Sequence, residues 1–251
     1  MEERFIFYPE RRIERTPDHY RLAFDNVWFR APDGPRLNGW FVPHPKAKTT
    51  LLWFHGNAGN ISHRLENIRL LHEKIPVHIF IFDYRGYGQS EGTASEEGTY
   101  RDATGALEYL RSRRDIDARR IVFFGRSLGA AVAADLAARE ECHALILETP
   151  FVSVREMARV ALPLPIGPLL RTRYDVLEKI RSVRAPLLVL HGDQDEVVPY
   201  AQGKRVFEAA PGPKEFYTIR GARHNDTYRI GGDAYFQALK DFMERAERRS
   251  F

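Results

Sequence analysis

The chain has 251 residues, of which 43% are hydrophobic and 29% charged, so it is long enough to bury a large core within one α/β domain. Its formal net charge is only +4, and the basic residues form no stripe interleaved with aromatic residues, so we expect no nucleic-acid partner. The single cysteine, Cys142, excludes a disulfide framework and a thiolate metal cluster.

The amino terminus carries charge where a secretory signal would need a longer apolar run, and residues 5–8 are too few to span a bilayer. As the chain stands, we therefore expect a cytoplasmic protein. Membrane association of a longer form stays open, and the sequence does not decide the oligomeric state.

Strand-like patterns open the chain. Residues 21–30 alternate in part between apolar and polar side chains, a turn cluster follows at 31–35, and a second run covers 37–42. This pattern predicts an antiparallel hairpin. Residues 49–54 then form a continuous apolar run, which is typical of a strand buried on both faces of a parallel sheet.

The loop at residues 55–60 follows that run and is rich in glycine and asparagine. Its glycines allow the backbone to approach a ligand closely, and the N–H of Asn57 is the natural second donor to an oxyanion. The alternative is a turn without a function. Apolar residues then recur at helical spacing, at Ile61, Leu65, Ile68 and Leu71.

Strands and helices continue to alternate. A strand at 77–82 leads into the loop 83–92, whose three glycines favour a structural crossover over a binding loop. A helix marked by residues 100–110 follows, then strands at 121–124 and 144–147. The alternation predicts a mostly parallel sheet covered by helices on both faces, with catalytic groups at the carboxyl ends of the strands.

The most informative stretch is Gly125-Arg126-Ser127-Leu128-Gly129, between the strand 121–124 and an alanine-rich helix. Gly-x-Ser-x-Gly on a strand-to-helix turn is the nucleophile elbow, which holds the Ser127 hydroxyl out above the sheet edge. The N–H of Leu128, in the first turn of the helix, is then a donor to an oxyanion.

The alternation is interrupted between residues 151 and 174. An amphipathic piece at 152–160 precedes an uncharged run at 161–170 that contains three prolines. This small insertion at the carboxyl edge of the sheet is a candidate lid, and the alternative is a rigid connector packed on the core. As a lid it would form one wall of an acyl pocket, through Leu164 and Ile166, and favour short to medium acyl chains.

The last third supplies an acid and a base. The loop after the strand 186–191 carries Asp193, Asp195 and Glu196, and Glu148 lies at another strand end. His224 lies in the loop after the last strand, at 215–219, and a final helix covers about 232–248. Ser127, Asp195 and His224 follow one another in the order of the nucleophile-elbow fold, each in a loop after a strand.

The chain resembles α/β-hydrolase serine hydrolases over essentially its whole length, and it is similar to their BEM46-like, ABHD13-type branch. The resemblance lies in residues 54–60, 83–88, 125–129, 191–199 and 224–225. It implies one α/β-hydrolase domain over 1–251 with a short cap, Ser127 as nucleophile, Asp195 as acid and His224 as base. It also implies that the N–H groups of Asn57 and Leu128 form the oxyanion hole. Relatives often carry a membrane anchor before the segment that matches residues 7–9, and that attachment is not carried over.

The implied chemistry is acyl transfer through an acyl-enzyme on Ser127, which needs no metal or organic cofactor. A small-molecule carboxylic ester is the expected substrate, because an alkoxide leaves with less help than an amine. Thioesterase activity such as depalmitoylation, and amidase or peptidase activity, stay open on the same triad. A non-catalytic binding protein of this fold is a further alternative.

Overall fold

The computed structural model describes residues 2–161 and 170–249, and the chain divides into two compact units, residues 1–123 and 124–251. The first unit contains α1 (Glu3–Ile6), the 3₁₀ helix η1 (Pro17–Tyr20), β1 (Asp25–Arg30), β2 (Arg36–Val42), β3 (Thr49–Phe54), the 3₁₀ helix η2 (Ile61–Arg64), α2 (Leu65–Lys74), β4 (Val77–Phe82), α3 (Glu96–Ser112) and the 3₁₀ helix η3 (Ala118–Arg120). In the sequence, β5 (Ile121–Arg126) runs across the boundary.

The second unit continues with α4 (Leu128–Arg139), β6 (Ala144–Glu148), α5 (Val154–Ala161), α6 (Val176–Ile180), β7 (Leu187–Gly192), α7 (Tyr200–Ala209), β8 (Lys214–Ile219) and α8 (Thr227–Arg249).

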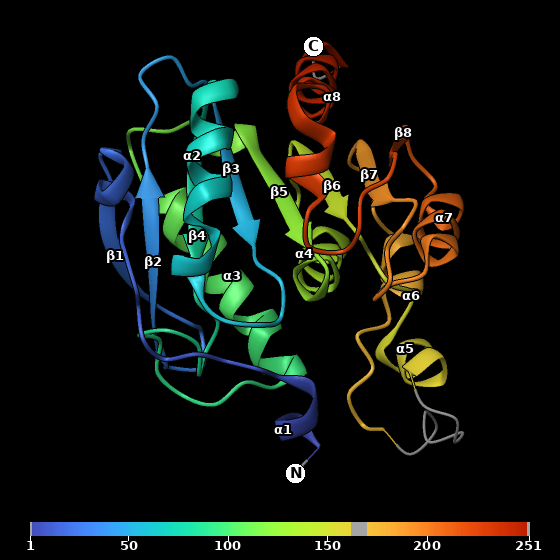
Figure 1. Ribbon diagram of the computed structural model, residues 1–251. Coiled ribbons are helices and arrows are strands. Elements are labelled where there is room, and N and C mark those ends of the chain that lie inside the picture. Colours follow the sequence, from blue (N-terminus) through green and yellow to red (C-terminus); the bar gives the residue numbers. More distant parts are fainter. Residues whose placement is uncertain (1, 162–169, 250–251) are drawn as a thin grey trace. The chain divides into compact units, whose positions relative to one another are not determined.

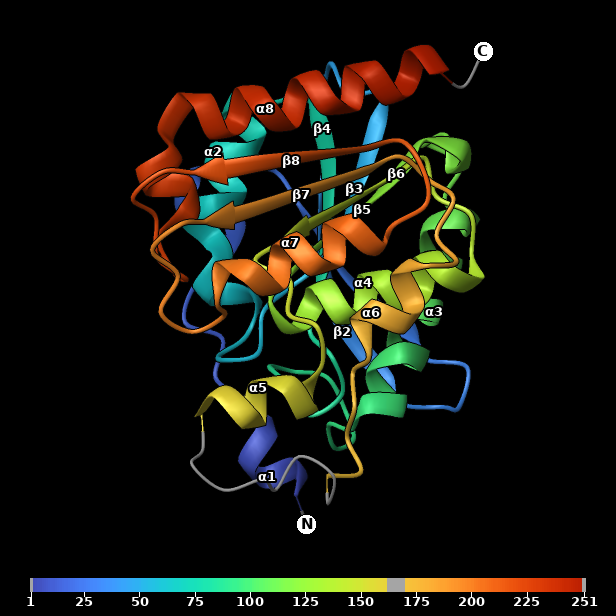
Figure 2. The same ribbon diagram turned by 90° about the vertical axis from the view of Figure 1, so that its right-hand side faces the viewer.

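In the first unit the strand order is β1-β2-β4-β3. The predicted hairpin is confirmed, because β1 pairs antiparallel with β2, with Trp28 opposite Asn38. β3 and β4 run parallel, and β3 is buried along its whole length, as its continuous apolar run predicts. α2 and α3 cover opposite faces of these strands (Figures 1 and 2). The first strand begins at Asp25, later than predicted, and Arg21, with φ 58°, ends η1 in a left-handed conformation.

In the second unit β6, β7 and β8 run parallel to one another, with Leu147 opposite Val189 and Val189 opposite Phe216. Figure 2 shows α8 along one face of these strands and α4, α6 and α7 along the other. Helices therefore cover both faces of a mostly parallel arrangement, which confirms the predicted α/β class. The loops that carry Asp195 and His224 follow the carboxyl ends of β7 and β8, as predicted.

The insertion begins with α5, where an amphipathic piece was predicted. Its two ends lie together, because the N–H of Val154 donates to the carbonyl of Arg173 and that of Val176 to the carbonyl of Val152. Leu164 and Ile166 lie outside the described residues. The role of the segment as a lid therefore stays a prediction, as does the single domain with this insertion.

Candidate active site

Ser127 lies on a strained turn between β5 and α4. Its backbone has φ 53° and ψ −117°, a combination that residues other than glycine rarely adopt. The turn brings the backbone so close together that a Cβ on Gly125 would lie 2.3 Å from the carbonyl oxygen of Gly129. The N–H of Ser127 donates to the carbonyl of Glu148 at the end of β6, at 2.9 Å. The sharp turn predicted from the Gly-x-Ser-x-Gly motif is therefore present.

The second unit brings Ser127, His224 and Asp195 together. Nε2 of His224 lies 3.1 Å from Oγ of Ser127, and Nδ1 of the same ring lies 2.8 Å from Oδ2 of Asp195. The Asp195 carboxylate is fully buried, and the His224 side chain is 8% exposed. A hydroxyl, an imidazole and a carboxylate connected in this order allow the imidazole to accept the hydroxyl proton while the carboxylate fixes the ring.

The Asp195 carboxylate is held by more than the imidazole of His224. Its Oδ1 accepts hydrogen bonds from the backbone N–H groups of Val197, at 2.9 Å, and Val198, at 2.7 Å. Burial alone would raise the pKa of this carboxyl, but the hydrogen bonds from His191 and His224 outweigh it and hold the pKa below its ordinary value. Asp195 is therefore ionised at neutral pH.

The neighbouring acids of this loop bind backbone groups instead. Oδ1 of Asp193 accepts the N–H of Gly221 at 2.7 Å, and Oε2 of Glu196 accepts the N–H of His224 at 3.2 Å. Both therefore tie the β7 loop to the β8 loop. The Asp195 side chain is the one of these three that contacts the imidazole ring.

The two expected oxyanion donors lie in different units. Leu128 is the first residue of α4, where backbone N–H groups have no partner within the helix. Asn57 follows β3 in the first unit, and its side chain secures that loop: Nδ2 donates to the carbonyl of Ile6 at 2.5 Å, and Oδ1 accepts the hydroxyl of Tyr87 at 2.8 Å. The role of their backbone N–H groups as a pair stays a prediction.

A buried histidine and aspartate lie behind the Asn57 loop. Nδ1 of His55 lies 2.7 Å from the carbonyl of Gly56, so this nitrogen carries the ring hydrogen. The other nitrogen, Nε2, faces Oδ1 of Asp83 at 3.5 Å, and both side chains are fully buried. Burial lowers the pKa of His55 to about 3 and raises the pKa of Asp83 to about 8, so the pair is neutral at pH 7.

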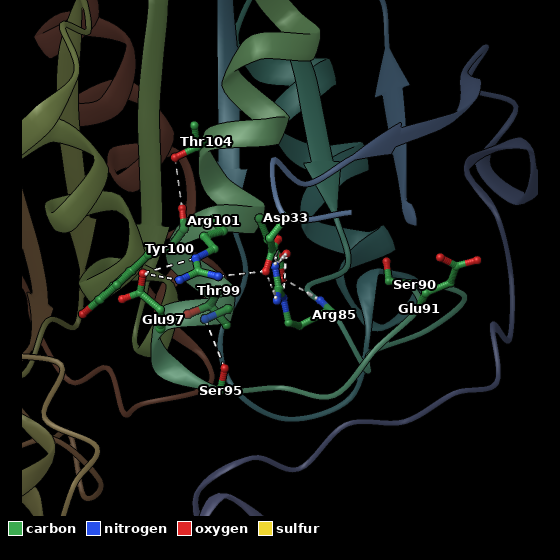
Figure 3. Close-up of polar contacts among 12 residues, drawn as sticks. Asp33, Arg85, Ser90, Glu91, Ser95, Glu97, Thr99, Tyr100, Arg101 and Thr104 are labelled. Carbon is green, nitrogen blue, oxygen red and sulfur yellow. Dashed lines mark hydrogen bonds and ion pairs between the residues drawn. The ribbon is translucent and has the colours of Figure 1, made fainter. Parts of the chain in front are cut away.

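The loop 83–92 is fixed by an arginine, as Figure 3 shows. The guanidinium of Arg85 binds Asp102 of α3 through Nε and Nη2, at 2.9 and 2.8 Å, and Asp33 through Nη1 and Nη2. Arg101 also reaches Asp33, at 3.2 Å. The hydrogen bonds from Arg85, with those from Arg101, lower the pKa of Asp33 to about 2. These bonds are consistent with the structural crossover favoured by the sequence.

Within residues 2–161 and 170–249 no group of three or more His, Cys, Asp and Glu side chains is arranged to hold a metal ion. Over the same residues, none of the helices has the length and apolar character needed to cross a bilayer.

Comparison with known proteins agrees with this architecture. A family model described as "Serine aminopeptidase, S33" matches residues 45–170 and 166–227. The WAV2 α/β-hydrolase domain protein of Arabidopsis thaliana is 36% identical, over 98% of this chain and 88% of its own length. Bem46 of Schizosaccharomyces pombe is 35% identical, over 91% of this chain and 79% of its own.

Among solved structures, an esterase of Pyrococcus furiosus superposes with a TM-score of 0.80 at 20% identity, covering 95% of this chain and 97% of its own. Est1E of Butyrivibrio proteoclasticus, solved with bound ferulic acid, gives a TM-score of 0.74 at 21% identity, over 88% of this chain and 99% of its own. These likenesses establish the fold.

Proposed function

Because the chain belongs to the α/β-hydrolase family and to its Bem46-like branch, we propose that it is a serine hydrolase that cleaves carboxylic esters through an acyl-enzyme on Ser127. The observation that carries the proposal is the continuous contact from Ser127 through His224 to Asp195, at 3.1 and 2.8 Å. In this proposal Ser127 is the nucleophile, His224 the base and Asp195 the acid that orients it.

The reaction proceeds in two halves. In the first, Oγ of Ser127 bonds to the acyl carbon while Nε2 of His224 takes the hydroxyl proton, and the imidazolium then gives that proton to the departing alcohol. In the second, His224 takes a proton from water, the hydroxide attacks the acyl carbon, and the carboxylic acid leaves as Ser127 regains its proton. The buried Asp195 carboxylate holds Nδ1–H and stabilises the imidazolium in both halves.

In this proposal the N–H of Leu128 stabilises the developing oxyanion, and the N–H of Asn57 as a second donor stays the prediction made from the sequence. The Leu128 amide lies at the positive end of the α4 dipole, which favours negative charge. A single oxyanion donor is worth ~10²- to 10³-fold in rate.

An ester is the preferred substrate class because its alkoxide leaves more readily than an amine. The names of the P. furiosus esterase and of other structural neighbours favour the same class. The description of the matching family as serine aminopeptidases favours amide cleavage as the second candidate. A thioesterase remains a third outcome of the same chemistry.

Covalent labelling by a fluorophosphonate probe tests whether Ser127 is a reactive nucleophile. We expect covalent labelling of the wild type that is lost in Ser127→Ala, with both proteins folded. A folded wild type that resists labelling would instead identify a binding protein that keeps the fold without the chemistry.

A substrate panel then separates the classes: nitrophenyl esters of graded acyl length, acyl thioesters and aminoacyl anilides. Each methylene held in an apolar pocket contributes ~0.8 kcal/mol, so kcat/KM for the esters should rise several-fold with each added carbon until the pocket is full and should then stay constant. We expect Leu164→Ala and Ile166→Ala to move that optimum to longer chains and to leave acetyl ester turnover unchanged. Equal effects on acetyl and octanoyl esters would assign the segment 161–170 to a structural connector.

A further inference from the structure

Arg126 lies between Gly125 and the proposed nucleophile, Ser127, and its side chain contacts the loop that carries His224. It ends β5, and its side chain is 8% exposed. Nη2 donates to the backbone carbonyl of His224 at 2.5 Å and lies 3.5 Å from Oδ1 of Asn225. The residue before Ser127 is therefore bonded to the backbone of the histidine that faces Ser127.

Glu148 lies beside this guanidinium, at the end of β6. Its carboxylate is fully buried, and Oε1 lies 3.5 Å from Nε of Arg126. The same carboxylate accepts the hydroxyls of Thr227, at Oε1, and Tyr235, at Oε2 and 2.9 Å, both from α8. Its backbone carbonyl accepts the N–H of Ser127. Glu148 thus contacts both the elbow and the helix that follows the His224 loop.

These contacts do not make Glu148 the acid of the triad. Its oxygens face Thr227, Tyr235 and Arg126, whereas Nδ1 of His224 faces Asp195. A buried ion pair is weak evidence for stability, because two charges lose their hydration when it forms. Arg126 and Glu148 lie beside Ser127 and His224, two residues of the proposed triad, so a role in the site explains the pair better than stability does.

On the basis of the proposed function, we propose that Arg126 and Glu148 are positioning residues, which hold the His224 loop on the elbow so that Nε2 stays within reach of the Ser127 hydroxyl. Glu148 orients the guanidinium from β6, and Arg126 carries that orientation to the His224 carbonyl. The hydroxyls of Thr227 and Tyr235 fix the Glu148 carboxylate. Neither Arg126 nor Glu148 touches the substrate.

The geometry needs arginine rather than lysine. Nε lies at an ion-pair distance of 3.5 Å from Oε1 of Glu148, without a hydrogen bond, while Nη2 donates to the His224 carbonyl, so one planar guanidinium contacts both partners. A lysine ammonium is a single point on a flexible stem, so it serves one partner at a time. Arg126→Lys should therefore keep the buried positive charge but hold the His224 loop less firmly on the elbow.

The test uses Arg126→Lys, Arg126→Met and the double variant Arg126→Met with Glu148→Gln. The double variant removes both charges of the pair, so it separates the loss of positioning from the presence of an unpaired buried carboxylate. Arg245→Met is the matched control. Arg245 binds Glu215 at the amino end of β8, with Nη2 at 2.6 Å from Oε2, and both side chains are partly exposed.

Four quantities are measured on each protein: the midpoint of urea unfolding, the rate of fluorophosphonate labelling at Ser127, and kcat and KM for an ester. A misplacement of about 1 Å costs ~10²-fold in rate, so we expect Arg126→Met to label and turn over ~10²-fold more slowly, with KM little changed. Arg126→Lys should be intermediate. The double variant should regain the unfolding midpoint lost in Arg126→Met and stay slow, and Arg245→Met should react as the wild type does.

The positioning role is overturned if the double variant regains both stability and rate, or if Arg126→Met is labelled at the wild-type rate.

A readout that does not depend on catalysis separates this proposal from the proposed function. The NMR signal of the His224 ring should shift and broaden in Arg126→Met and stay unchanged in Arg245→Met. An unlabelled wild type with that shift would reject the hydrolase and keep the positioning role; an unchanged His224 signal would reject the positioning role by itself.

Discussion

Nε2 of His191 lies 3.4 Å from Oδ2 of Asp195, the same oxygen that lies 2.8 Å from Nδ1 of His224. Nε2 of His191 also lies 3.0 Å from the carbonyl of Val198, so this nitrogen carries the hydrogen of the ring. The N–H of Val198 in turn donates to Oδ1 of Asp195. His191 is fully buried, and its ring contacts the same oxygen of the proposed triad acid that faces His224.

We predict that His191→Phe keeps a ring in this space but weakens the site. The carbonyl of Val198 loses its donor, and an unpaired buried polar group costs about 1–3 kcal/mol of unfolding free energy. A loosened Asp195 should lower kcat by about 10-fold and leave KM unchanged, since a small misplacement of a catalytic group slows the chemistry. Urea unfolding and ester kinetics measure both effects.

Gly203→Ala is an independent check of the same position. A Cβ on Gly203 would lie 2.1 Å from Nδ1 of His191, so the methyl group must displace the ring. We expect kcat to fall here too. Wild-type kcat in both variants would assign His191 to packing alone.

The proposed triad acid, Asp195, gives a second prediction. Asp195→Asn should leave the fold intact and lower kcat by ~10⁴-fold, because an amide favours the wrong imidazole tautomer. Asp193→Asn is the matched control, since this side chain binds the backbone N–H of Gly221. Steady-state kinetics on a nitrophenyl ester compare the two. A crippled Asp193→Asn beside a mild Asp195→Asn would move the acid to Asp193.

The sequence predicts the strands well, and with them the loops that carry Ser127, Asp195 and His224, because both depend on local patterns. Short apolar runs mark β3, β4 and β7, and Ser127, Asp195 and His224 each follow one strand. α8 is interrupted at Gly232, whose backbone is non-helical with φ 51° and ψ −141°, so its long helical part follows this glycine, as predicted. The short helical segment at 227–231 was not predicted.

The supporting residues were not predictable, because their partners are distant in the chain. Arg126 occupies a variable position of the motif, and its acceptor is the carbonyl of His224, 98 residues away. Glu148 at a strand end is equally suited to a triad acid until its contacts with α8 are seen. A local signal did exist for α6, where Asp175 caps the helix by accepting the N–H of Glu178.

The arginines of Figure 3 give a prediction for stability. Arg85→Met leaves the fully buried Asp102 without its ion-pair partner, which should cost about 3–5 kcal/mol of unfolding free energy. Arg101→Met removes an arginine that is 48% exposed and also binds Asp33, and it should cost no more than about 1 kcal/mol. Urea unfolding compares the two, and equal losses would refute the distinction between the buried and exposed pairs.

The neutral carboxyl of Asp83 gives a prediction for the pH dependence of stability. Its pKa is raised from 3.8 to about 8 by burial, so the folded protein holds this proton over a range in which the unfolded chain has lost it. Stability from this group is therefore fully present below about pH 4 and is lost as the pH rises to about 8. Above that pH both states are ionised, and the loss stops.

Asp83→Asn removes the titrating group and keeps its shape. The difference in unfolding free energy, Asp83→Asn variant minus wild type, should become more positive from about pH 7 to about pH 8 and level off by about pH 9. His55 does not disturb this window, because burial lowers its pKa from 6.5 to about 3 and the ring is essentially neutral in both states above pH 7. Urea unfolding of both proteins at matched ionic strength measures the difference, and a value independent of pH would show that Asp83 is already ionised in the folded protein.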